Sequence, residues 1–100
     1  SAAVFRMNRA SLRNFGLKLP VNFLLQDETI LAELSKSPFA LDNSEKLPYV
    51  IRGDRQDGAF VLQFFSETGV IGNIRVKSSD LGEAVRKLIE EVFVDSLKEE

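Results

Sequence analysis

The chain has 100 residues, 44% of them apolar and 28% charged, which is the composition of one globular domain rather than of a disordered segment. It has no cysteine, which excludes disulfides, thiolate metal sites and cysteine nucleophiles. It also has no histidine, the side chain that most often serves as a general acid, a general base or a metal ligand near neutral pH. We therefore expect a protein that is not an enzyme and that holds no metal or cofactor.

The sequence shows no sign of a membrane-spanning segment. No apolar run approaches the roughly 20 residues that cross a bilayer, and no signal-peptide pattern is present. We expect a soluble, intracellular protein in a compartment that the sequence does not specify. The first methionine is Met7, which favours a processed chain or a piece of a larger protein.

Residues 1–20 are predicted to form a basic leading segment ahead of a single α+β domain at residues 21–100. The first quarter of the chain holds four cations and no acid, so the rest carries −6 to reach the net charge of −2. Arg6, Arg9 and Arg13 recur at helical spacing, which suits an amphipathic helix or an organelle targeting segment. The alternative is a leading segment whose arginines pair with the domain's own acids.

Two short elements are predicted next. Apolar side chains alternate over residues 21–26, which favours a strand, with a helix as the alternative. Asp27 is suited to cap a short helix near residues 27–36, and Pro38 disfavours its continuation. Residues 37–47 are the predicted linker inside the domain.

The C-terminal half predicts an antiparallel meander. Residues 67–69, Glu-Thr-Gly, suit a three-residue hairpin loop, and residues 53–58 suit a six-residue loop. The register that follows pairs Phe60 with Val76, Leu62 with Ile74, Phe64 with Gly72, Ile51 with Phe60 and Tyr49 with Leu62. Both hairpins indicate the same core face. The integrin-binding tripeptide Arg52-Gly53-Asp54 would then lie at a hairpin tip, although a match of three residues arises easily by chance.

A long C-terminal helix is predicted from Asp80, which begins a capping box with Glu83, to about Leu97. One stripe of this helix is apolar and comprises Leu81, Ala84, Val85, Leu88, Ile89 and Val92. The predicted fold class is α+β: an antiparallel meander of three or four strands, packed by the long C-terminal helix, with the short helix near residues 27–36.

Two surfaces are left over once this fold is built. The same register places Val50, Val61, Phe65 and Ile71 on the second face of the meander, among the cations Arg52, Arg75 and Lys77. The second surface is a helix patch of Phe93, Val94 and Leu97, which lie off the main apolar stripe. The N-terminal half of the domain folds over the second sheet face in one interpretation, and a partner binds there in the other.

These surfaces predict a non-catalytic protein-interaction or assembly module that forms a homo-oligomer or docks within a larger complex, with the two apolar sets as its contact residues. The alternative is a module that binds single-stranded nucleic acid. Phe65 would then stack on a base while Arg52, Arg75 and Lys77 contact phosphates. The acidic pI of about 5.2 counts against nucleic acid, because neutralising phosphates requires a basic surface.

Overall fold

The computed structural model describes residues 18–66 and 73–93. Several predictions fall outside these ranges. They are the leading segment up to residue 17, the hairpin loop at residues 67–69, and the surface residues Ile71, Val94 and Leu97.

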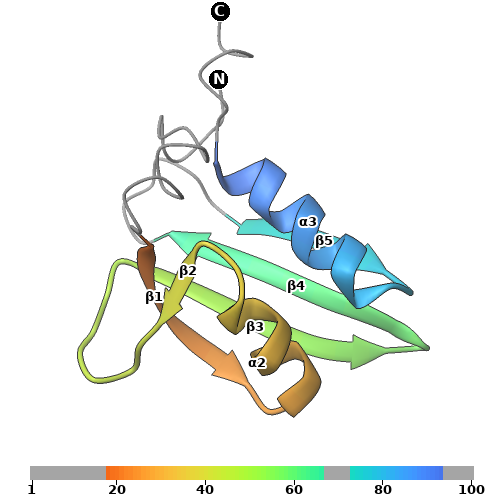
Figure 1. Cartoon of the computed structure of the whole chain (residues 1–100), viewed down its shortest axis with the longest axis horizontal. Coiled ribbons are helices and arrows are strands. Elements are labelled where there is room, and N and C mark those ends of the chain that lie inside the picture. The colour runs from red at the N-terminus through yellow and green to blue at the C-terminus, as the bar shows by residue number, and fades with distance from the viewer. Residues whose placement is uncertain (1–17, 67–72, 94–100) are drawn as a thin grey trace, which may run out of the picture.

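The described residues form one mixed sheet of five strands with two helices (Figure 1). In chain order the elements are β1 (Leu19–Leu25), α2 (Glu28–Ser35), β2 (Phe39–Leu41), β3 (Tyr49–Gln56), β4 (Ala59–Ser66), β5 (Asn73–Ser78) and α3 (Leu81–Val92). The strand order across the sheet is β2-β1-β3-β4-β5. The α+β class and the β3-β4-β5 meander are confirmed, whereas an entirely antiparallel sheet is wrong.

The sheet is mixed because β1 is parallel to both of its neighbours. Parallel strands need a crossover, and α2 supplies the one between β1 and β2. Asp27 caps α2 as predicted, accepting hydrogen bonds from the backbone N–H groups of Thr29 and Ile30. The predicted linker at residues 37–47 contains β2, which Phe39 anchors with a side chain that is 1% exposed.

A second crossover, at residues 42–48, leads from β2 past β1 to β3, and two asparagines hold it. The Asn22 side chain donates to the carbonyl oxygens of Asp42 and Glu45 and accepts from the Leu47 N–H, each at 2.8 Å. The Asn43 side chain accepts from the Phe23 N–H at 3.0 Å and donates to the Phe23 carbonyl oxygen at 3.1 Å. Asn43 thus satisfies backbone groups that a longer β2 would have paired.

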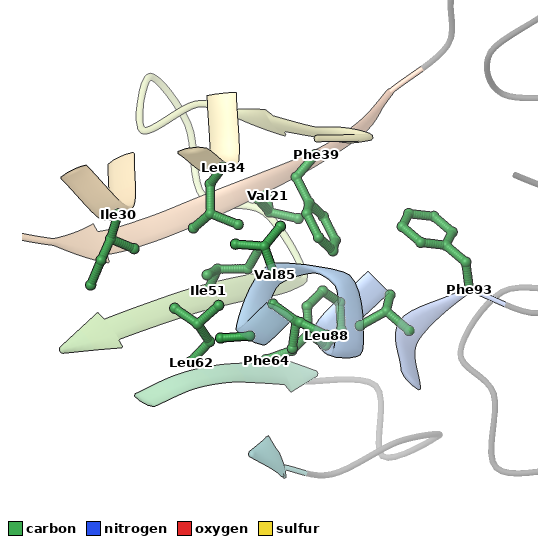
Figure 2. Packing of buried hydrophobic residues seen from close by; sticks show 12 residues of the cluster. Val21, Ile30, Leu34, Phe39, Ile51, Leu62, Phe64, Val85, Leu88 and Phe93 are labelled. Carbon is green, nitrogen blue, oxygen red and sulfur yellow. The ribbon is translucent and has the colours of Figure 1, made fainter. Parts of the chain in front are cut away.

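Both helices pack on the same face of the sheet. Their buried side chains share one core with the inward-facing residues of the strands, as Figure 2 shows. Val21 is fully buried in that core, together with Ile30 and Leu34 of α2. The N-terminal half therefore widens the sheet and covers its helix side, and the interpretation in which Val21 and the short helix fold over the second sheet face is wrong.

The β3–β4 hairpin is tighter than predicted. Asp57 and Gly58 have φ values of 51° and 77° and form a two-residue turn between Gln56 and Ala59. Asp-Gly tolerates positive φ at both positions, and such a turn matches the twist of the flanking strands. The six-residue loop is therefore wrong.

The register of both hairpins differs from the prediction by an even number of residues. Ile51 faces Phe64 rather than Phe60, Leu62 faces Val76 rather than Ile74, and Phe64 faces Ile74 rather than Gly72. Because side chains alternate between the faces with a period of two, an even shift leaves each residue on its predicted face.

The Arg52-Gly53-Asp54 tripeptide lies inside β3 and not at a hairpin tip. Gly53 has a packing role there. A Cβ atom at this position would lie 3.0 Å from the Ile30 side chain of α2 and 2.7 Å from the Leu25 side chain of β1. The glycine lets α2 approach the backbone of β3.

The start of α3 is as predicted, and its end is not. The Asp80 side chain accepts from the Glu83 N–H at 3.3 Å, whereas the helix ends at Val92, before the predicted limit. Phe93 leaves the helix with extended backbone angles, and its ring packs 5.4 Å from that of Phe39, so that Phe93 is 2% exposed. Phe93 is therefore a core residue rather than part of a surface patch.

Candidate interaction face

The sheet face opposite α2 and α3 is the candidate site, and we call it the open face. Alternation along each strand assigns its residues. They are Asn22 and Leu24 of β1, Val50, Arg52 and Asp54 of β3, Val61, Gln63 and Phe65 of β4, and Asn73, Arg75 and Lys77 of β5. Neither described helix covers this face.

The apolar part of the open face lies toward β1. Val50 and Phe65 are cross-strand partners and are half-buried. Leu24 of β1 lies beside Arg52 of β3. Its side chain is 64% exposed, the largest exposure of any large hydrophobic side chain in the described residues. Together these three side chains form an apolar patch on a sheet face that would otherwise be polar.

Val61 belongs to the open face by register but is not available for contact. It lies on the interior strand β4, between Asp54 of β3 and Lys77 of β5, and is 2% exposed. The prediction of Val61 as a contact residue is therefore wrong.

The cations of the open face differ from most others in how they are partnered. Arg52, Arg75 and Lys77 form no ion pair with a carboxylate of the described residues, and Arg75 donates only to the Gln56 amide oxygen, at 3.2 Å. Elsewhere, ion pairs join Lys36 to Glu33, Arg55 to Asp27, Arg86 to Glu90 and Lys87 to Glu83. The acid of the open face, Asp54, accepts from the backbone N–H of Arg55 at 2.8 Å. The open face therefore carries more positive than negative charge.

A shallow depression adjoins the apolar patch. It has a volume of about 560 Å³ and lies between the open-face residues Asn22, Leu24 and Val50 and the crossover residues 43–46. The hydrogen bonds of Asn22 and Asn43 hold the crossover in place, so the far wall of the depression is built into the fold.

Arg55 and Asp27 form a separate polar cluster, to which the open-face cations do not belong. Arg55 bonds to the Asp27 carboxylate at 2.5 Å, donates to the Thr29 hydroxyl at 3.0 Å and lies over the Phe60 ring. The Thr29 hydroxyl bond, and next the Arg55 bond, lower the pKa of Asp27 to about 2 against a partial opposing effect of desolvation. These contacts fasten the start of α2 to β3.

Within residues 18–66 and 73–93, no group of three or more acidic side chains is arranged to hold a metal ion. Neither α2 nor α3 is long and apolar enough to span a membrane.

The structure brings together part of the predicted site. Val50, Phe65, Arg52, Arg75 and Lys77 share the open face, as predicted from alternation alone. Leu24 was missed, because its place follows from the parallel pairing of β1 with β3, which no local pattern indicates.

Comparison with known proteins adds no further assignment: no protein-family model, curated protein or solved structure matches the chain.

Proposed function

We propose that this chain is a non-catalytic protein-interaction module whose partner binds the open face. The observation that carries the proposal is the combination of an apolar patch, Leu24, Val50 and Phe65, with cations that have no carboxylate partner within residues 18–66 and 73–93. Antiparallel sheet faces in water are largely polar, and apolar patches beside charged groups are typical of contact surfaces.

The dimensions of the open face favour a short partner segment. Across β1, β3, β4 and β5 it spans about 14 Å, and the three side chains that β3, β4 and β5 each contribute span about 14 Å along the strand. This area is well below the roughly 800 Å² that each partner buries in a standard interface. We therefore expect a contact of modest affinity that the neighbouring depression enlarges.

Single-stranded nucleic acid is the second candidate partner, because Phe65 shares the open face with Arg52, Arg75 and Lys77. An aromatic ring among cations suits stacking and phosphate contact. Asp54 on the same face and the net charge of −2 make protein the first candidate.

A site-specific photocrosslink tests the proposal. Phe65→benzoylphenylalanine replaces one aromatic side chain on the open face with a reactive one. The same substitution at Arg86, whose side chain is 55% exposed on α3, is the matched control. Irradiation in an extract of the source cells is expected to yield a protein adduct from position 65 that is absent from position 86 and is reduced by Val50→Asp.

Light scattering distinguishes a foreign partner from self-association, because a homo-oligomer has a mass above 11.2 kDa. A monomer of 11.2 kDa that gives no adduct specific to position 65 would contradict the proposed function.

A further inference from the structure

We infer that the partner presents an acidic, extended segment, with an apolar side chain near Leu24 and Val50 and carboxylates about four residues along it over Arg75 and Lys77. This inference rests on the proposed function and specifies the class of partner. It is argued from charge, from the position of the depression and from strand spacing.

Charge complementarity indicates an acidic partner. Arg75 and Lys77 project from the same face of β5, two residues and thus about 7 Å apart. Neither has an ion-pair partner among the described carboxylates. Carboxylates at that spacing would each find a cation without displacing an internal ion pair.

The same charges disfavour two other occupants. A second copy of the chain, packed face to face about a two-fold axis, would bring its own Arg52, Arg75 and Lys77 to the same interface. The N-terminal stretch of the same chain carries Arg6, Arg9 and Arg13 with no acid. Like charges would oppose each other in both arrangements.

The position of the depression sets the orientation of the segment. The depression lies at the β1 side of the open face, with Leu24 and Val50 on one wall and Glu45 and Lys46 on the other. An apolar side chain fits against Leu24 and Val50, whereas the opposite charges of Glu45 and Lys46 give a carboxylate no net attraction there. The acidic end of the segment therefore lies over β5.

Strand spacing sets the distance between the apolar side chain and the carboxylates along the segment. Three inter-strand steps separate β1 from β5, which amounts to about 14 Å, and an extended chain advances about 3.3 Å per residue. An apolar side chain over β1 and a carboxylate over β5 are therefore about four residues apart in a segment that crosses the strands.

Two synthetic peptides test the inference. The probe is the amidated hexapeptide Leu-Ser-Gly-Ser-Glu-Glu, and its control carries Gln in place of both Glu residues. Binding to the full chain is followed by amide chemical shifts in low salt. We expect shifts at Val50 and Lys77 with the acidic peptide and at least about fivefold weaker binding of the Gln peptide, given the contribution of exposed ion pairs.

Charge-neutralising variants supply the second readout. Arg75→Gln and Lys77→Gln are each expected to weaken binding of the acidic peptide about two- to fivefold. Arg86→Gln removes the same charge from α3, where Arg86 pairs with Glu90, and should leave binding unchanged. All three positions are exposed, so the variants are expected to fold, and circular dichroism checks this.

Other outcomes overturn the inference. Equal binding of the two peptides, or no binding of either, removes the acidic partner class, while a crosslink specific to position 65 would still uphold the proposed function. A crosslinked partner segment that contains no acidic residues would likewise remove the acidic partner class and uphold the proposed function. A six-nucleotide oligothymidine is the third probe. If it bound more tightly than the acidic peptide, and if Lys77→Gln abolished that binding, the partner class would be nucleic acid rather than a protein segment.

Discussion

Replacing Gly53 with alanine tests the packing that places α2 on the helix side of the sheet and leaves the other face open. The new Cβ atom would lie 2.7 Å from Leu25 Cδ2, 3.0 Å from Ile30 Cγ2 and 3.2 Å from Leu62 Cδ2. Carbon atoms in contact are ordinarily about 3.5–4.0 Å apart. Ile30 and Leu62 are fully buried, so these side chains have little room to move.

The magnitude follows from two opposing effects. Overpacking of this kind costs about 1–3 kcal/mol. The smaller conformational freedom of alanine in the unfolded chain returns about 0.4–1 kcal/mol. We expect a net loss of about 1–2 kcal/mol in the free energy of unfolding, which lowers Tm by roughly 5–15 °C in a domain of this size.

Thermal and urea denaturation measure this loss, with Gly82→Ala as the matched control. A Cβ atom on Gly82, in the first turn of α3, would meet Asp80 Oδ1 at 3.4 Å, which is an ordinary contact. That variant is expected to gain about 0.5–1 kcal/mol, because alanine favours the helix over glycine. If Gly53→Ala were as stable as the wild type, α2 would not lie against β3 as described.

Three further predictions concern the core residue Phe93, the second crossover and the cap of α2. Phe93→Asp is expected to unfold much of the protein, because losing a buried Phe side chain costs about 3–5 kcal/mol before the buried charge is counted; circular dichroism would show a folded variant if Phe93 were a surface residue. Asn22→Ala removes three hydrogen bonds to the crossover and should cost about 2–3 kcal/mol, with faster hydrogen exchange at the Leu47 amide; unchanged exchange would refute the role of Asn22. The pKa of Asp27 is lowered from 3.8 to about 2, so its contribution is present above about pH 4 and is lost as the pH falls toward 2. Asp27→Asn, which keeps a capping side chain, should flatten the pH dependence of the unfolding free energy in that range. If the variant lost stability between pH 4 and pH 2 as the wild type does, Asp27 would not be the group responsible.

Local chemistry made α3 and the capped start of α2 predictable. Asp27 and Asp80 are capping residues followed by apolar side chains at helical spacing, and both cap the helices in the structure. Alternation likewise placed Val50 and Phe65 on one face, and this assignment survived an error in register because the shift was even. The Asp57-Gly58 turn was also readable from the sequence, but the longer loop was preferred in its place.

The remaining features depend on residues that are far apart along the chain. Whether a three-residue segment such as β2 forms a strand, and whether β1 pairs in parallel, depends on what α2 and the crossover bring beside them. Leu24 joins the open face only because β1 pairs with β3. Phe93 is buried because its ring packs against the ring of Phe39, which is far away in the sequence.

By itself, the sequence determined the class of the fold, the helix starts and the sets of residues that share a strand face, because periodicity and capping act between neighbours in the chain. The tertiary structure alone decided that α2 covers the same sheet face as α3 and which cations have no carboxylate partner among the described residues, because these follow from contacts between distant segments.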